Sequence, residues 1–267
     1  MVSFGGRHAE LVRQALPAGS GVTFLPGGTV YDRPTSAIRS YRKLLAAFVA
    51  DGAQQIRIVG ELPSEALGST WDWWARYESA VNHAYDDFPL WSMCAYDTRV
   101  TPPRVLTDVA RTHPRVARPD GSHVPTGVYT EPTSYLAEPR AMLLDPVQRT
   151  VPVVELADPT PAQARAAVHA ADRGQLPADD VEDLVVAVSE MVTNAQGHGL
   201  PPVSMRLWSG ADRIVVTVSD GGDGPKDPFA GLLPATNGSP AGWASGSPTS
   251  PAATWRCTAA RTASRSG

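Results

Sequence analysis

The sequence predicts an α/β protein of two domains, for three reasons. The chain has 267 residues, and at about 150 residues per domain this is enough for two. Helical and strand-like segments alternate in the first part, as in a layered α/β domain with a largely parallel sheet. Residues 115–152, rich in Pro, Gly, Ser and Thr, separate it from a second ordered part. We expect a first domain at residues 1–136, a linker at 137–150 and a second domain at 151–234.

Apolar residues at helical spacing predict the helices of the first part, as Ile38, Tyr41 and Leu45 do in its first helix. Short apolar or β-branched segments between these helices predict buried strands. The expected helices are residues 36–51, 71–85 and 105–112, and the expected strands are residues 55–60 and 90–96.

The second part is expected to begin with a strand and two helices. Thr160 and Pro161 stand where a helix cap and first turn belong, and Asp179 and Asp180 can cap a longer helix. Two alternating strands follow, and Ser209, Gly210, Ala211 and Asp212 form a hairpin turn between them. The expected order is a strand at 151–156, helices at 162–172 and 179–195, and strands at 203–208 and 214–218.

The composition excludes several classes of protein. A net charge of −4 argues against a nucleic-acid binder that relies on a broad positive field. Two cysteines are too few for a disulfide scaffold or a four-ligand zinc site. No apolar run approaches the roughly 18 residues that span a bilayer, and the first residues lack the apolar core of a signal peptide. A soluble cytoplasmic protein that binds neither membranes nor nucleic acid directly is therefore expected.

The longer helix carries three polar residues four positions apart, Glu190, Asn194 and His198, which share one helical face. A carboxylate can polarise a hydroxyl group, and an amide oxygen one turn later can bind a hard cation such as Mg²⁺. Taken alone, the same residues also fit a solvated polar face of a helix.

The last expected strand runs into a loop that contains Asp220, Gly222 and Gly224. An aspartate at a strand end can accept a hydrogen bond from an exocyclic amine, and the glycines allow a flat ring to approach the backbone. Taken alone, this loop also fits a glycine-rich β-turn.

Together and in this order, the two motifs resemble the nucleotide-binding domain of the GHKL ATPase superfamily, an α/β sandwich. Glu190 and Asn194 match its N-box, and Asp220 with the two glycines matches the motif whose aspartate binds adenine. The segment from Ser189 to Gly199 is similar to the anti-sigma factor serine kinases of the RsbW/SpoIIAB type.

This resemblance implies an ATP-dependent protein serine kinase that controls transcription by partner switching. Glu190 would activate the acceptor serine, Asn194 would bind Mg²⁺, and Asp220 would bind adenine, while His198 and the two glycines would help to bind ATP. The implied partners are a sigma factor and an anti-anti-sigma protein of the STAS type, and a homodimer is compatible with the resemblance. The alternative is a non-catalytic sensory or binding module with a vestigial ATPase domain.

The first domain resembles the MEDS domain, a sensory module. The matching stretches are residues 57–61, 71–85, 90–97 and 113–114. The resemblance implies an unidentified small-molecule ligand, whose pocket Glu61, Glu78 and Tyr96 could line; the alternative is a satisfied polar pair within the core. Cys94 is expected to be a buried small hydrophobic residue.

The C-terminal tail departs from the GHKL pattern. After Pro234 the superfamily has a Gly-x-Gly motif that opens a phosphate-binding helix, and then a closing strand. From Asn237 to Gly267 this chain has no Leu, Ile, Val, Phe, Asp, Glu or Lys, which predicts a disordered tail at residues 235–267 without a closing strand, and hence weak ATP binding. Translated one base out of register, the same segment reads as a glycine-rich helix start followed by two alternating strands. We therefore expect a frameshift near residues 240–242.

Overall fold

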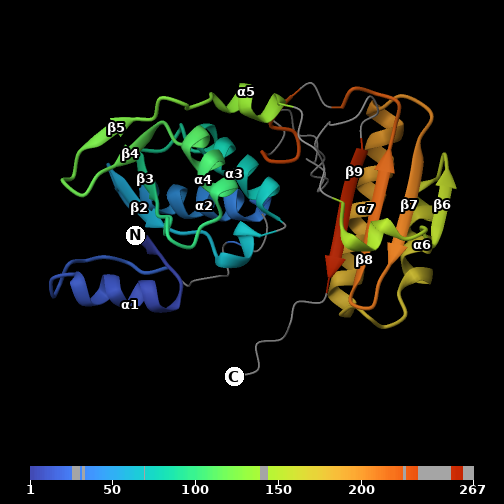
Figure 1. Ribbon diagram of the computed structural model, residues 1–267, viewed down its shortest axis with the longest axis horizontal. Helices are drawn as coiled ribbons and strands as arrows, with labels where there is room; N and C mark the ends of the chain where they lie inside the picture. Colours follow the sequence, from blue (N-terminus) through green and yellow to red (C-terminus); the bar gives the residue numbers. More distant parts are fainter. Residues whose placement is uncertain are drawn as a thin grey trace. The chain divides into compact units, whose positions relative to one another are not determined.

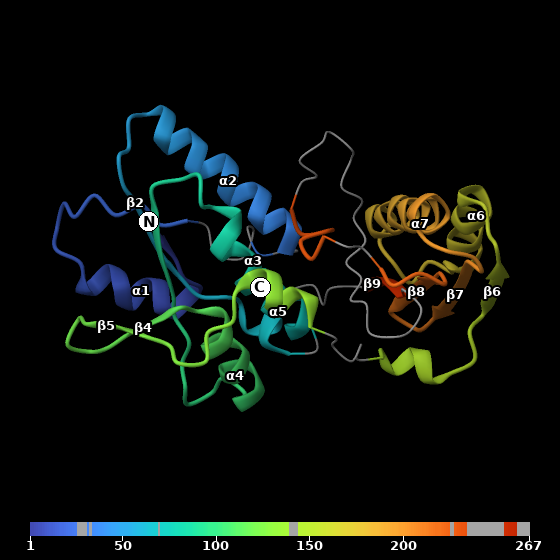
Figure 2. The same cartoon turned by 90° about the horizontal axis from the view of Figure 1, so that it is seen from above.

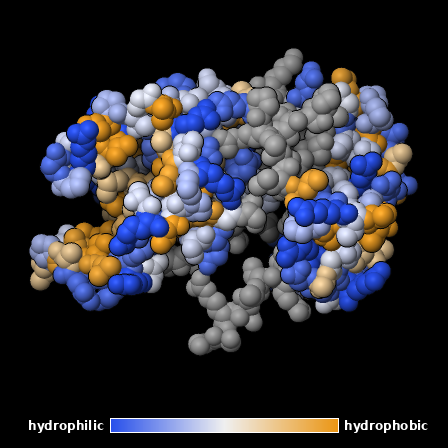
Figure 3. Space-filling view, viewed as in Figure 1, coloured by the Kyte–Doolittle hydropathy of each residue, from blue (hydrophilic) through white to orange (hydrophobic). Residues whose placement is uncertain are grey.

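The structure is a computed structural model that describes residues 1–25, 31, 34–68, 70–138, 144–224 and 227–233, and the backbone of residues 254–260. The chain divides into two compact units, Met1–Glu138 and Pro139–Gly267 (Figure 1). Both units are built from helices and strands, so the predicted α/β class is confirmed. The face shown in Figure 3 mixes hydrophilic and hydrophobic residues over both units. Among the described residues, no helix is both long enough and apolar enough to cross a membrane.

Unit 1 contains a three-stranded parallel sheet in the order β1 (Val2–Ser3), β2 (Ile56–Gly60) and β3 (Leu90–Cys94). Strands β2 and β3 are the two predicted strands, and β1 is an additional one. The register pairs Ile56 with Leu90 and Gly60 with Cys94. Because the carboxyl ends of parallel strands meet at one edge of a sheet, the residues that follow β2 and β3 are brought to the same edge.

The predicted helices of unit 1 are confirmed as α2 (Pro34–Ala50), α3 (Trp71–Ala84) and α4 (Pro103–Thr112). Helix α3 is the central one, since nine of its side chains are buried and it contacts α2, α4 and the 3-10 helix Ser64–Leu67. It therefore holds the residues that it carries in a fixed position within the core.

Besides the short strand β1 and the 3-10 helix Ser64–Leu67, four elements of unit 1 were not predicted. They are α1 (Gly6–Ala15), β4 (Arg115–Ala117), β5 (His123–Pro125) and α5 (Pro132–Ala137). The expectation that residues 115–152 form only a loop and a linker is therefore wrong for residues 115–137, which contain β4, β5 and α5. Strands β4 and β5 form an antiparallel hairpin whose turn is closed by the backbone N–H of Ser122, which donates to Asp120 at 2.9 Å. In α5, Tyr135 and Leu136 are fully buried and belong to unit 1.

Asp108 of α4 joins three helices of unit 1. Its carboxylate accepts a hydrogen bond from Trp71 Nε1 at 2.9 Å and another from the Tyr135 hydroxyl at 2.8 Å. Asp108→Ala would leave these donors of two buried side chains without this acceptor. We expect it to lower the free energy of unfolding of unit 1 by about 2–4 kcal/mol in urea titrations. The neighbouring control Thr107→Ala should cost less than about 0.5 kcal/mol; equal costs for both variants would contradict this role.

Unit 2 is a four-stranded antiparallel sheet with two helices on one face (Figure 2). Its core joins apolar residues of both helices to inward-facing residues of the sheet such as Met205, Leu207 and Val216. A capping box of Thr160 and Gln163 begins the first helix. The elements are the 3-10 helix Pro146–Arg149, β6 (Val154–Ala157), α6 (Pro161–Ala171), α7 (Ala178–His198), β7 (Ser204–Ser209), β8 (Arg213–Ser219) and β9 (Thr254–Ala260).

Strand β9 contradicts the expectation that the tail forms no closing strand. It pairs antiparallel with β8 along its whole length, from Ser219↔Thr254 to Arg213↔Ala260. The prediction was wrong because it counted missing aliphatic residues, whereas main-chain pairing to the open edge of β8 requires no particular side chain. Thr254, Trp255, Cys257 and Thr258 also have favourable strand propensity. The place at which the frameshift is expected, residues 240–242, lies outside the described residues.

Candidate functional site

Helix α7 presents Glu190, Asn194 and His198 on one face. The helix is unbroken from Ala178 to His198, so residues four positions apart lie one turn above another. Glu190 and Asn194 are partly buried, and His198 is exposed. Within the described ranges, none of these three side chains has a recorded hydrogen bond or ion pair. All three are therefore available to a ligand.

Neighbouring residues show which flank of α7 this face forms. Arg165 of α6 donates to the Ser189 hydroxyl at 3.0 Å, and Gln196 donates at 2.8 Å to the carbonyl two residues before α6. At about 100° per residue, Glu190 and Asn194 point roughly 100–140° away from Ser189. They therefore lie on the flank that faces away from α6. Because α6 contacts β7 while α7 contacts β8 and β9, this flank is on the β9 side of the sheet.

Asp220 links the loop after β8 to the segment after α7. The side chain is only 3% exposed, and its Oδ1 accepts hydrogen bonds from the backbone N–H of Gly222 at 2.7 Å and of Leu200 at 3.2 Å. The N–H of Gly221 in turn donates to the carbonyl of Leu200. Residues of the two sequence motifs, far apart in the chain, are thus brought together at one end of unit 2.

Glycines surround Asp220 because there is no room for a side chain. A Cβ on Gly199 would lie 2.5 Å from Cγ of Asp220, and one on Gly222 would lie 2.9 Å from its Oδ1. A Cβ on Gly221 would lie 2.7 Å from the carbonyl oxygen of Pro201. Gly224 has φ of +84°, in the left-handed region that favours glycine. Gly222 and Gly224 were predicted site residues, whereas Gly199 was included only as the last residue of the matched segment and had no predicted role.

The donor set suits the groups that the sequence predicted. Both recorded hydrogen bonds of Asp220 end on Oδ1, which leaves Oδ2 for the amine edge of a flat ring. The glycines beside it pack closely against Asp220 and the backbone of Leu200 and Pro201, which holds the carboxylate in place. Glu190 and Asn194 offer carboxylate and amide oxygens, the ligands that Mg²⁺ prefers. ATP and Mg²⁺ therefore fit the residues that are present.

In unit 1, Glu61 lies apart from the other predicted pocket residues. Its Oε1 accepts from the backbone N–H of Gly5 at 3.0 Å, and its Oε2 lies 2.7 Å from Nδ1 of His8. Both contacts are with the start of α1, so Glu61 anchors this helix to the end of β2. This position favours a structural role for Glu61.

Glu78 and Tyr96, the other two predicted pocket residues, lie with His113. Glu78 is 1% exposed, and its Oε2 lies 3.2 Å from Nε2 of His113. The ring of Tyr96 stands edge-on to that of His113, with centroids 6.2 Å apart. Asn82 holds the arrangement by donating at 2.7 Å to the carbonyl of Thr112, directly before His113.

Cys94 was expected to be a small hydrophobic residue, yet it is only partly buried and faces polar groups. Its Sγ, a Glu78 carboxylate oxygen and a ring nitrogen of His113 all lie within 4.8 Å of one another. Burial, together with the Glu78 carboxylate, raises the pKa of the Cys94 thiol. Sequence reasoning missed this cluster because its members belong to three separate segments.

Comparisons with known proteins find two domain families in this chain. Residues 7–114 match the family model of MEDS, the methanogen/methylotroph, DcmR sensory domain. Residues 155–249 match the model of the histidine kinase-like ATPase domain. A search of curated proteins finds no match to the chain. The suspected architecture, a sensory domain followed by an ATPase domain, is confirmed.

Proposed function

We propose that this chain, in which a MEDS domain precedes a histidine kinase-like ATPase domain, is an ATP-dependent anti-sigma regulatory factor of the protein serine kinase type. A sensory domain joined to such an ATPase domain is the composition of a regulatory kinase-like protein. The observation that most strongly supports the proposal is the hydrogen bond from Leu200 to Asp220. It ties the aspartate suited to adenine to the end of the helix that carries Glu190 and Asn194.

The chemistry follows from the residues on this side of unit 2. Asp220 would accept a hydrogen bond from the exocyclic amine of adenine, and Asn194 would hold Mg²⁺, which would neutralise phosphate charge. The substrate is a serine hydroxyl on an anti-anti-sigma protein of the STAS type. Its oxygen bonds to the γ-phosphorus as the bond to the leaving ADP breaks, and its proton passes to the Glu190 carboxylate. Phosphorylation of the anti-anti-sigma protein would then leave this chain free to bind a sigma factor.

A second candidate is a non-catalytic module that sequesters its partner without turnover. One sequence observation favours it: the stretch between Leu233 and Thr254 contains no Gly-x-Gly motif, which in the superfamily opens the phosphate-binding helix. The frameshift hypothesis accounts for the same observation. Because β9 provides the closing strand of the sheet, the missing glycine motif is the one departure from the superfamily that the frameshift hypothesis still has to explain.

Phosphate transfer separates the two candidates. The purified chain, a STAS-type protein and γ-labelled ATP with Mg²⁺ are incubated, and labelled serine is located by mass spectrometry. The kinase proposal expects label on one serine of the STAS-type protein. A chain that binds a sigma factor equally well with and without ATP, and transfers no label, would support the non-catalytic module.

A further inference from the structure

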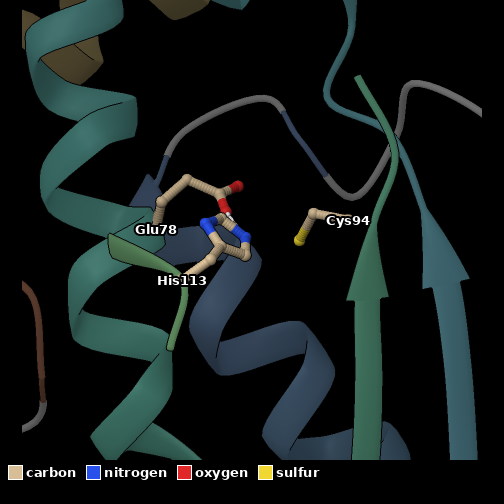
Figure 4. A group of neighbouring side chains, drawn as sticks. All are labelled: Glu78, Cys94 and His113. Atoms are coloured by element: carbon tan, nitrogen blue, oxygen red, sulfur yellow. Dashed lines mark ion pairs between the residues drawn. The ribbon is translucent and has the colours of Figure 1, made fainter. Parts of the chain in front are cut away.

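The cluster of Glu78, Cys94 and His113 in unit 1 is built from three separate elements (Figure 4). Glu78 projects from α3, Cys94 is the last residue of β3, and His113 directly follows α4. The view shows the Cys94 sulfur directed toward the Glu78–His113 pair. Three potential ligand atoms, one each of oxygen, sulfur and nitrogen, therefore converge on one point.

The ring of His113 is oriented by its other nitrogen. Nδ1 lies 2.9 Å from the carbonyl oxygen of Val109, so in the neutral ring Nδ1–H donates to this carbonyl and the lone pair is on Nε2. Nε2 then faces Oε2 of Glu78 at 3.2 Å, and two acceptors at this distance attract each other only through a shared cation or proton. A carbonyl partner on the distal nitrogen is also the usual arrangement for a histidine that binds a metal.

Buried polar atoms at the cluster lack hydrogen-bond partners. Oε2 of Glu78 and the hydroxyl of Tyr96 are both inaccessible to solvent, and among the described residues neither atom has a hydrogen-bond partner; Oε2 has only the ion-pair contact with His113 at 3.2 Å. The Glu78 side chain is 99% buried, since only 1% of it is exposed. A buried carboxylate whose one charged neighbour is a histidine remains costly when that ring is neutral, and a cation bound between the two would remove that cost.

We propose that Glu78, Cys94 and His113 bind a transition-metal ion of the zinc class. A mixed set of thiolate, imidazole and carboxylate ligands suits Zn²⁺ and its borderline neighbours, whereas Mg²⁺ and Ca²⁺ take oxygen ligands. The three atoms already lie within 4.8 Å of one another, so small side-chain rotations would bring them to ligand distances of about 2.0–2.3 Å. This site does not depend on the function proposed for unit 2.

Three protein ligands leave one position of a tetrahedral ion open. In zinc proteins such an open position takes water or an exogenous ligand, whereas purely structural sites have four protein ligands. The ion would therefore provide unit 1 with a point of attachment for a small coordinating molecule. This is a chemical means of sensing that the predicted pocket residues alone did not suggest.

Cobalt titration of the full-length reduced chain tests the proposal. Co²⁺ substitutes for Zn²⁺ and reports a sulfur ligand by charge-transfer absorption in the near ultraviolet. We expect one Co²⁺ per chain with this absorption, displaced by Zn²⁺ but not by excess Mg²⁺. Cys94→Ser should abolish the absorption, and His113→Gln and Glu78→Gln should weaken Co²⁺ binding by at least about 100-fold, more than the typical cost of losing an outer partner.

Matched controls keep the result specific to the cluster. His83→Gln changes an exposed histidine on the same helix as Glu78, and Cys257→Ser changes the other cysteine of the chain. Both should bind Co²⁺ as the unchanged chain does. Circular dichroism of each variant confirms that it is folded. If the unchanged chain shows no charge-transfer absorption, or if Cys94→Ser retains it, the Glu78–His113 contact is a buried ion pair and the proposal is wrong.

Discussion

Replacing Asp220 by asparagine is expected to weaken ADP binding by about 5- to 150-fold, equivalent to about 1–3 kcal/mol. Asparagine keeps an oxygen at Oδ1 for the backbone N–H groups of Leu200 and Gly222, so the loop should remain in place. It replaces the carboxylate Oδ2 by an amide nitrogen, which cannot accept a hydrogen bond from the adenine amine. The loss should therefore fall on the nucleotide rather than on the fold.

Calorimetry with ADP and Mg²⁺ measures this effect, because ADP carries the base without requiring phosphate transfer. Asp223→Asn is the matched control, since Asp223 is exposed in the same loop. The control should bind ADP within about twofold of the unchanged chain. Equal ADP affinity for Asp220→Asn and the unchanged chain would remove Asp220 from the adenine site.

Deleting strand β9 should have the largest effect on stability. Residues 214–216 and 218 of β8 are fully buried, and all seven residues of β8 pair with β9. A chain that ends at Leu233 would leave this strand edge unpaired, which exposes main-chain donors and acceptors and invites association with other chains. We expect unit 2 to lose about 3–5 kcal/mol, from several main-chain hydrogen bonds worth roughly 1 kcal/mol each.

Urea unfolding measures the loss of stability, and light scattering measures the association with other chains. The control chain ends at Ala260, which keeps β9 and removes only the residues after it. It should unfold like the full chain. If the chain that ends at Leu233 is equally stable and remains monomeric, β9 does not close the sheet of unit 2.

Much of the fold could be predicted because its strongest elements have clear periodicity. In α2, Ile38, Tyr41 and Leu45 recur at helical spacing and are all buried. In β2, buried and less buried residues alternate from Ile56 to Gly60. Where burial in the core alone determines which residue types an element carries, hydrophobic periodicity is sufficient to identify that element.

The unpredicted elements depend on contacts that no local pattern records. Strand β9 forms because β8 offers an open edge, and α5 forms where Tyr135 and Leu136 can be buried in unit 1. The candidate sites show the same limit. The spacing of Glu190 and Asn194 follows from one helix, whereas the Cys94–His113 contact requires the tertiary fold. Short elements with few apolar residues are stabilised by such long-range contacts rather than by their own propensity.

The central claim, that unit 2 is a serine kinase in which Glu190 is the base, is tested most directly by phosphate transfer. Four proteins are compared: the present chain, a chain whose residues after Pro240 are translated one base out of register, and Glu190→Gln and Glu182→Gln variants of the latter. Glu182 is an exposed carboxylate on the same helix and serves as the control. The readout is the rate of ATP-dependent serine labelling on a STAS-type protein.

We predict that the out-of-register chain and its Glu182→Gln variant label the serine at equal rates. Glu190→Gln should lower this rate by at least about 100-fold, the usual contribution of a positioned general base, while ADP binding is retained. The present chain should be slower than the out-of-register chain; equal rates would refute the frameshift. Serine labelling that is unaffected by Glu190→Gln, or no labelling by any chain that binds ADP, would contradict the central claim.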